Sequence, residues 1–421
     1  MKEYVDRAQA TAHAAAVVEA YEKYVNPSRA RLARLMGTDD IEWEAEGAVV
    51  RTARGREFID CLGGFGTFNV GHRHPKVLEA VTKALARIPI STRVLLAAPL
   101  AQLAEVLAAI TPGELQYTFP VHSGAAAVEG ALKLARAATG RKKIVSTQGG
   151  FHGKTYGALS ATGKRSYREP FEPLVPRFEH VPYGDEAAAR AAIDEETAAF
   201  IVEPVQGEAG IIVPPDGYLR AVRQRCDEVG ALLVVDEVQT GFGRTGYMFG
   251  CEHDAVAPDI MTLAKALGGG IFPLGAFVGT ERAWRPLIEE PYLHTTTVES
   301  LISFEAALAT IRVLQEEQLV ERSAREGAYF LAELRGLARE FPDVVHEVRG
   351  RGLMIGITFA RDGQAGFVMA ELLAKGVLTA FTLNNPLVMR LEPPLVITRR
   401  QIDTVLERMR EALAAARQVL G

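Results

Sequence analysis

Cysteine is scarce in this chain of 421 residues. The three cysteines, Cys61, Cys226 and Cys251, lie far apart and include no C-x-x-C pair. This spacing argues against a disulfide framework and against a structural zinc site, and it suits a reducing compartment. We therefore expect buried thiols, no metal centre and a cytoplasmic location.

Long apolar runs and an excess of positive charge are missing too. The apolar segment from Val94 to Ile110 is interrupted by Pro99, Gln102 and Glu105, whereas a membrane span needs about 20 apolar residues in succession. Residues Met1 to Asp6 lack the basic start and apolar core of a secretion signal, so we expect a soluble helix in this region. The formal net charge of −5 argues against nucleic acid or an anionic membrane as the main partner and favours a small molecule.

Short apolar runs alternate with helical segments in the middle of the chain. Strands are predicted at Lys143 to Ser146, Ala198 to Glu203, Leu232 to Asp236 and Ile260 to Ala264, and helices at Val128 to Ala138 and Tyr218 to Val229. Short apolar strands spaced about one helix apart predict right-handed βαβ crossovers and a mainly parallel sheet covered by helices on both faces. The pattern therefore predicts a three-layer α/β fold.

The pattern changes on both sides of this region. Residues 42–60 predict a small antiparallel piece after an N-terminal helix, and the chain beyond Leu314 predicts a long charged helix, a strand pair around 344–359 and a final amphipathic helix from Arg399. We expect residues 1–70 to join a small domain, residues 71–318 to form the large α/β domain, and residues 319–421 to form a C-terminal α+β small domain.

Three predicted strands end in a charged residue, namely Glu203, Asp236 and Lys265. Ligands of an open parallel sheet bind at the carboxyl ends of its strands, so these side chains are candidates for one site. A lysine that ends a buried strand is partly desolvated, which favours the neutral amine that attacks carbonyls. An acid one βαβ unit upstream can stay ionised against a protonated pyridine nitrogen. A surface lysine and a helix-capping aspartate are the alternatives.

Two further segments have the composition of a cofactor site. Ser123-Gly124-Ala125 precedes a predicted helix, where backbone N–H groups bind phosphate, although the same residues also serve as an ordinary N-terminal cap. Phe151 stands between glycines after another predicted strand. It is either plain core or an aromatic face that stacks on a flat heteroaromatic ring.

An ordered set of motifs covers nearly the whole chain from about Trp43 onward. The set consists of Ser123-Gly124 before a helix, Phe151-His152-Gly153, Glu203-Pro204-Val205-Gln206-Gly207-Glu208, Asp236-Glu237-Val238-Gln239-Thr240-Gly241, Ala264-Lys265-Ala266-Leu267-Gly268-Gly269-Gly270 and Leu293-His294-Thr295-Thr296-Thr297. Together these motifs resemble the class III aminotransferases of fold type I, which use pyridoxal 5'-phosphate (PLP). The resemblance implies a mainly parallel seven-stranded sheet in a three-layer large domain, with a smaller α+β domain.

The resemblance also assigns roles around the cofactor ring. It implies that Lys265 carries PLP as a Schiff base and later moves the proton between the substrate carbon and the cofactor. Asp236 would pair with the pyridine nitrogen, and Gln239 would reach the phenolic oxygen. The two faces of the ring would be covered by Val238 and Phe151.

The cofactor phosphate has its own implied partners. Ser123, Gly124 and the backbone at Ala125 would hold it, joined by Thr297 of the partner subunit. The resemblance therefore implies a homodimer with active sites at the interface.

The implied reaction moves an amino group from an amine to a 2-oxoacid in two stages. Within the class, the chain is most similar to putrescine aminotransferases in segments 58–72 and 251–259. Lys154 stands where ornithine and acetylornithine aminotransferases have an arginine that grips a carboxylate, and lysine is a poor replacement for that geometry. The donor is thus expected to lack a nearby carboxylate. Arg390 resembles the arginine that binds the 2-oxoacid carboxylate, and Glu208 resembles the acid that pairs with it otherwise; a plain surface ion pair is the alternative.

Several positions depart from the family pattern. The usual Asn-Ser-Gly-Thr-Glu is replaced by His122-Ser123-Gly124-Ala125-Ala126, and Phe-Gly-Gly-Asn-Pro after Thr297 is replaced by Val298 to Ile302. Arg93 lies in a segment that has lost the carboxylate and amide expected of a diamine enzyme. These changes favour a site reshaped, by nature or by design, for a larger or less polar amine or ketone. An aminomutase, a decarboxylating transaminase and a non-catalytic homologue remain as alternatives.

Overall fold

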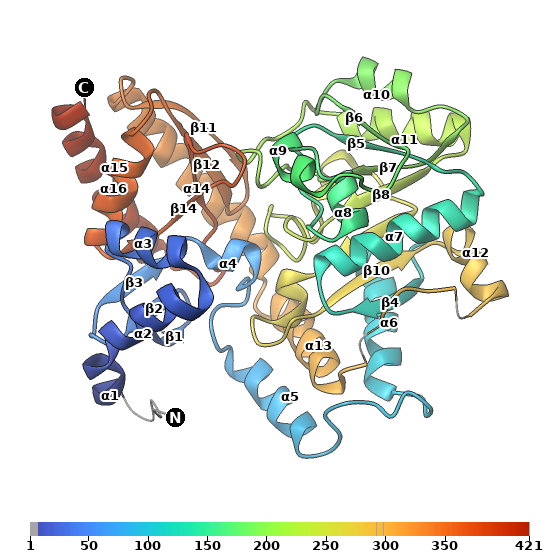
Figure 1. Ribbon diagram of the computed structural model, residues 1–421, viewed down its shortest axis with the longest axis horizontal. Coiled ribbons are helices and arrows are strands. Elements are labelled where there is room, and N and C mark those ends of the chain that lie inside the picture. Colours follow the sequence, from blue (N-terminus) through green and yellow to red (C-terminus); the bar gives the residue numbers. More distant parts are fainter. Residues whose placement is uncertain (1–6, 292, 298, 421) are drawn as a thin grey trace.

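A seven-stranded sheet forms the centre of the computed structural model, which describes residues 7–291, 293–297 and 299–420 (Figure 1). Its order is β4 (Tyr117–Val121), β10 (Gly275–Gly279), β9 (Ile260–Leu263), β8 (Leu232–Asp236), β7 (Thr197–Val202), β5 (Lys143–Thr147) and β6 (Phe178–Val181). The neighbours from β9 to β6 are all parallel, whereas β10 is antiparallel to both β4 and β9. The predicted strands and the mainly parallel sheet are confirmed.

Helices cover both faces of this sheet. Leu232 and Val234 of β8 pack in one apolar cluster with α7 (Gly124–Thr139), and Leu233 and Val235 pack in a second cluster with α11 (Tyr218–Val229). Successive side chains of a strand point to opposite faces, so both faces of β8 are buried. The three-layer α/β fold is therefore confirmed, and the polar ends of the strands meet at one edge.

The N-terminal segment forms a second sheet with a distant part of the chain. Helices α1 (Arg7–Ala12), α2 (Ala14–Ala20) and α3 (Pro27–Met36) precede β1 (Glu42–Glu46), β2 (Val49–Thr52) and β3 (Glu57–Asp60). These strands are antiparallel, as predicted, and β3 pairs in parallel with β13 (Val377–Leu378). The expectation for Met1 to Asp6 lies outside the described residues.

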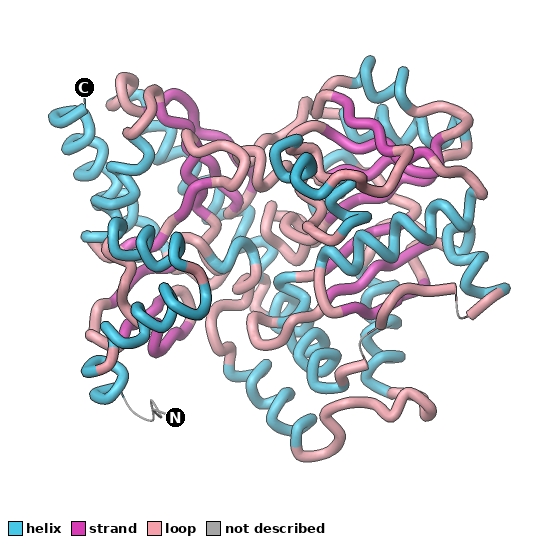
Figure 2. The backbone as a smooth tube through the Cα atoms, in the orientation of Figure 1, coloured by secondary structure: helices cyan, strands magenta, loops and turns pink. Residues whose placement is uncertain are grey.

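A third sheet, of order β11-β12-β15-β14, lies in the C-terminal part of the chain (Figure 2). Its strands are β11 (Val345–Arg351), β12 (Met354–Phe359), β14 (Ala380–Phe381) and β15 (Val388–Leu391), and its helices are α14 (Leu319–Glu340), α15 (Gln364–Ala374) and α16 (Arg399–Leu420). In Figure 1 this part lies beside the N-terminal strands and apart from the seven-stranded sheet, forming the smaller unit of the fold.

The remaining helices lie between these strands along the chain. They are α4 (Gly63–Gly66), α5 (Pro75–Leu85), α6 (Ala98–Ile110), α8 (Tyr156–Ala161), α9 (Arg165–Arg168), α10 (Glu186–Ala192), α12 (Glu281–Glu289) and α13 (Leu301–Glu316), with short 3-10 or π-helical turns at Tyr21–Val25, Glu169–Phe171, Gly250–Asp254 and Lys265–Gly268.

All three cysteines are buried free thiols, as expected. Within the described ranges, no helix combines the length and apolar character that a membrane crossing requires.

Candidate active site

A cavity of about 520 Å³ lies at the carboxyl ends of β7, β8 and β9. Its size falls in the range of small-molecule sites. Ten residues predicted from the sequence line it, namely Ser123, Gly124, Ala125, Phe151, Glu203, Glu208, Asp236, Val238, Gln239 and Lys265. The fold thus brings together side chains that are scattered over more than a hundred positions of the sequence.

Lys265 directly follows Ala264 at the end of β9 and faces this cavity. Burial lowers the pKa of its ammonium group, although the negative charges of Glu208 and Glu392 oppose that shift. Its φ of 47° lies in the left-handed region, which a lysine seldom adopts without tertiary support. The site therefore favours a neutral, nucleophilic amine at a fixed position.

Asp236 ends β8 and is held on both oxygens. Oδ1 accepts a hydrogen bond from the Val238 N–H at 3.1 Å, and Oδ2 lies 2.7 Å from Nδ1 of His152. Burial alone would lower the pKa of His152, but its hydrogen bond with Asp236 and the charge of that carboxylate raise it above the ordinary value. These two contacts fix the orientation of the Asp236 carboxylate, which is suited to pair with a cationic ring nitrogen. His152 carried no role in the sequence prediction, although it belongs to one of the motifs.

The Glu203 carboxylate accepts hydrogen bonds from two backbone N–H groups, one of them in the Phe151 segment. Its Oε1 accepts from the Phe151 N–H at 2.9 Å, and its Oε2 accepts from the Gly207 N–H at 3.2 Å. Burial raises the pKa of this carboxyl group to about 7. Glu203 therefore fixes the backbone that presents the Phe151 ring to the cavity.

The N-terminus of α7 opens into the same cavity. Ser123 is its cap, since its Oγ accepts from the Ala126 N–H at 3.2 Å. The first N–H groups of a helix have no partner within the helix and favour an anion. A Cβ on Gly124 would lie 2.9 Å from Cγ1 of Val238, so glycine is required for this close approach. These features fit the phosphate and the flat ring of PLP.

Four predicted residues lie outside this chain's cavity lining, namely Thr297, Lys154, Arg93 and Arg390, of which Arg390 contacts the lining residue Glu208. Thr297 donates its hydroxyl to the Pro120 carbonyl at 2.9 Å. Lys154 is exposed and lies over the Tyr167 ring, with Nζ 5.0 Å from the ring centroid. Arg93 is exposed as well. Their predicted roles, one of which needs a second subunit, stay predictions.

Two segments that depart from the family pattern lie side by side. The Ser91 N–H donates to the Glu299 carbonyl at 2.9 Å, and Ile90 and Ser300 form an isolated β-bridge. Ser300 then caps α13. The altered stretch before Arg93 and the altered loop after Thr297 are thus one surface feature, whereas Val298 lies outside the described residues.

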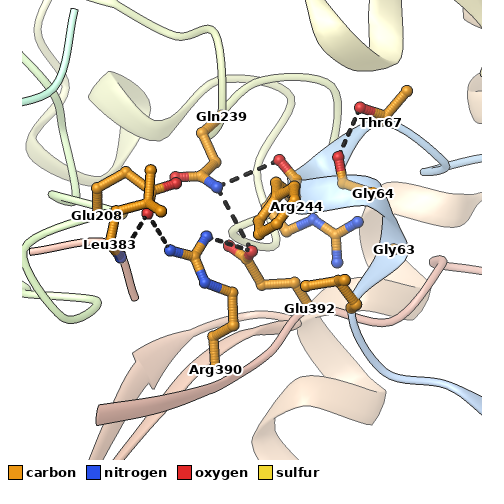
Figure 3. A network of polar contacts seen from close by, with 12 residues as sticks. Gly63, Gly64, Thr67, Glu208, Gln239, Arg244, Leu383, Arg390 and Glu392 are labelled. Carbon is orange, nitrogen blue, oxygen red and sulfur yellow. Dashed lines mark hydrogen bonds and ion pairs between the residues drawn. The ribbon is translucent and has the colours of Figure 1, made fainter. Parts of the chain in front are cut away.

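Arg390 is fully buried between two carboxylates (Figure 3). Its Nη2 donates to Glu208, and its Nη1 donates to Oε2 of Glu392 at 3.2 Å. Gln239 donates its amide N–H to the Phe65 carbonyl at 3.2 Å and lies 3.4 Å from the same Glu392 oxygen. The alternative of a surface ion pair between Arg390 and Glu208 is wrong, because both side chains are buried. Glu392 was missed in the sequence.

Comparisons with known proteins agree with this geometry. The family model "Aminotransferase class-III" matches residues 40–413. An ornithine aminotransferase from Toxoplasma gondii superposes with a TM-score of 0.86 at 31% identity, covering 90% of both chains. A transaminase from the marine bacterium Virgibacillus gives 0.86 at 32% identity, covering 91% of this chain and 94% of that one. A thermostable (S)-enantioselective omega-transaminase from Thermomicrobium roseum gives 0.82 at 33% identity, covering 90% and 93%.

The chain therefore belongs to the class III aminotransferases, as the motifs predicted. It is a PLP-dependent transaminase, with the fold of that family and a smaller second unit.

Proposed function

We propose that this transaminase moves an amino group from a primary amine or diamine, putrescine-like or bulkier, to a 2-oxoacid such as 2-oxoglutarate or pyruvate. One observation carries the proposal. A buried arginine, Arg390, is paired with Glu208, which itself lines the Lys265 cavity. Arg390 can exchange Glu208 for the carboxylate of a bound 2-oxoacid, and it can return to Glu208 when an amine without a carboxylate is bound. Acceptor and donor can therefore alternate in one site by a ping-pong cycle.

The chain's own residues then have defined tasks. PLP, when bound, supplies an electron sink for the substrate carbon. Lys265 would hold the cofactor through Nζ and would carry a proton to and from that carbon. Asp236, held by His152, would keep a proton on the ring nitrogen. Val238 and Phe151 would cover the ring, and Gln239 would face its phenolic oxygen.

The phosphate task falls to Ser123, Gly124 and Ala125 at the start of α7, joined by Thr297 of the partner subunit. The exposed apolar side chains of Val94, Leu95 and Leu96 support a homodimer, because apolar clusters of this kind mark protein interfaces. We also infer a cytoplasmic location from the buried free thiols. The division at residues 70 and 318 into a joined N-terminal segment, a large domain and a small domain is likewise our proposal.

The donor assignment depends on Lys154 and Arg93. Lys154 lies on Tyr167 and does not line the cavity, which favours a donor without a nearby carboxylate. One structural relative is named an omega-transaminase and another an ornithine aminotransferase. The similarity to putrescine aminotransferases makes putrescine the first donor to test.

The experiment is a spectral titration of the PLP-loaded protein. Putrescine and 1-phenylethylamine are added separately, and the visible absorbance band of the Lys265-bound cofactor is followed. We expect an amine to abolish the band and pyruvate or 2-oxoglutarate to restore it. Lys265→Ala should have no such band, whereas Lys142→Ala, at an exposed position, should behave as the parent.

Other outcomes identify the alternatives. Carbon dioxide release would indicate a decarboxylating transaminase, and product formed without any 2-oxoacid would indicate an aminomutase. A band that no amine changes would indicate a non-catalytic homologue.

A further inference from the structure

Glu392 and Arg390 occupy the end of one strand. Arg390 lies in β15, and Glu392 is the first residue after that strand, two positions beyond Arg390. Residues two apart in a strand point to the same side, so both side chains enter the same buried space. The arginine side chain and the Glu392 side chain are both 0% exposed. A buried carboxylate next to an arginine that already has Glu208 as a partner carries a desolvation cost, so its presence needs a reason.

Only one of the two carboxylates can be reached from the cavity. Glu208 lines the cavity, and Glu392 is absent from its lining. A ligand carboxylate that enters from the cavity can therefore replace Glu208 on Nη2 of Arg390, while Glu392 stays on Nη1. The fork of the guanidinium keeps one fixed partner and one exchangeable partner.

Glu392 also connects Arg390 with the cofactor side of the cavity. Its Oε2 lies 3.2 Å from Nη1 of Arg390 and 3.4 Å from the amide nitrogen of Gln239 (Figure 3). Gln239 lines the cavity. One carboxylate oxygen thus orients both the arginine and the glutamine.

The charge of Glu392 extends into the cavity. Burial lowers the pKa of Lys265, and the negative charges of Glu208 and Glu392 work against that effect. Arg244 is also buried near Glu392. Burial lowers the pKa of its guanidinium group to about 10, and the negative charge of Glu392 opposes this shift only in part. Arg244 donates its hydrogen bonds to Asn69 and to two carbonyls instead. The second oxygen of Glu392 has no hydrogen-bond partner among the described residues.

Donor and acceptor have opposite charge. A primary amine is an ammonium ion at neutral pH, and a 2-oxoacid is a carboxylate. On the basis of the proposed function, we propose that Glu392 is a positioning and specificity-determining residue, which keeps Arg390 and Gln239 oriented during carboxylate exchange and favours the cationic donor over the anionic acceptor. The donor class it selects is an amine that brings no carboxylate to Arg390.

Glu392→Gln tests the charge at constant shape. The amide oxygen can keep both contacts of Oε2, so the orientation persists while one negative charge is lost. We expect the KM for pyruvate and 2-oxoglutarate to fall about tenfold, a modest effect for a charge at an effective dielectric constant near 20. The KM for the amine should rise. Glu407→Gln, at an exposed position, is the matched control and should change neither value.

A binding measurement on the PLP-loaded protein avoids turnover altogether. Butanoate carries a carboxylate but no ketone group that could accept an amino group, and calorimetry should show about tenfold tighter binding to Glu392→Gln than to the parent. Glu392→Ala removes orientation as well as charge, so it should lower kcat of the acceptor half-reaction, which Glu392→Gln preserves. Should the alanine variant fail to fold, the glutamine variant alone decides.

The possible results separate the two proposals. If the parent protein uses no 2-oxoacid at all, the proposed function fails. If the parent uses 2-oxoacids but Glu392→Gln leaves butanoate affinity unchanged or lowers it, only the inference on Glu392 is overturned. Equal shifts of donor and acceptor KM in the same direction would also overturn it.

Discussion

Asp236 Oδ2 lies 2.7 Å from Nδ1 of His152, although 84 positions separate the two residues in the sequence. Both side chains are buried, and the shared hydrogen bond raises the pKa of the histidine against the opposing effect of burial. The histidine thereby fixes one oxygen of the acid, and the Val238 N–H fixes the other. An acid held at both oxygens can keep one geometry toward a ring nitrogen.

Replacing the acid with its amide tests this arrangement. Asp236→Asn preserves volume but removes the charge that the ring nitrogen and His152 share. Loss of a hydrogen bond to a charged group costs about 2–3 kcal/mol, so kcat/KM should fall roughly 100-fold. Steady-state rates with saturating PLP measure the effect. Asp216→Asn, whose parent side chain is 98% exposed, should retain full activity, and an Asp236→Asn rate within about threefold of the parent would contradict the assigned role.

The fold was largely predictable because burial on both faces leaves a clear pattern. The fully buried strands β7, β8 and β9 are continuous apolar runs, which identify a parallel sheet. The pairing of β13 with β3 was not predictable, since two residues carry no periodic signal. The single N-terminal helix that we expected is several short helices, which end at a π-helical turn and at the Asn26 cap.

The site was predictable where its residues follow strands. Asp236 ends β8, and Glu203 and Lys265 follow the adjacent strands β7 and β9, so their meeting follows from topology alone. Glu392 and His152 were missed because their roles depend on contacts between distant elements. A signal for Glu392 existed in its spacing of two from Arg390, because residues two apart in a strand share a face, but no strand was predicted at these positions.

The pH dependence of stability should reflect Glu203. Burial raises the pKa of its carboxyl group to about 7, above the usual value of a free glutamate. A raised pKa means that the folded protein binds this proton more tightly than the unfolded chain does. Protonated Glu203 therefore stabilises the fold fully at pH values below the pKa of the unfolded chain's glutamate, and this stabilisation is lost as the pH rises through about 7. We expect the free energy of unfolding to fall by about 3 kcal/mol from this group between the two pKa values.

The Glu203→Gln variant isolates that contribution. The amide does not titrate, so the difference in unfolding free energy between parent and variant should change with pH between about 4.5 and 7. Urea denaturation at several pH values measures the difference. A constant difference across that interval would show that Glu203 does not carry the dependence. The amide also loses one of the two backbone hydrogen bonds, at a pH-independent cost of about 1 kcal/mol.

Glu208 should stabilise the loop between β14 and β15, in addition to its ion pair with Arg390. Its Oε2 accepts from the Leu383 N–H at 3.0 Å, and its backbone carbonyl accepts from the Asn384 N–H at 2.9 Å. In Glu208→Ala the first hydrogen bond is lost and the second is kept. Amide hydrogen exchange at Leu383 should accelerate roughly tenfold, whereas Asn384 serves as the internal control. Equal acceleration at both amides would indicate general loosening of the loop.

Close packing of α14 against the β11–β12 turn should make one glycine of that helix irreplaceable and leave another free. A Cβ on Gly327 would lie 2.2 Å from the carbonyl carbon and oxygen of Gly352, and backbone cannot move aside cheaply. Gly327→Ala should therefore lower the free energy of unfolding by about 1–3 kcal/mol. A Cβ on Gly336 would meet only Nη2 of Arg339, at 3.9 Å, so Gly336→Ala should raise it by about 0.5–1 kcal/mol through helix propensity. Urea denaturation of both variants decides, because equal effects of the two substitutions would rule out the contact as the cause.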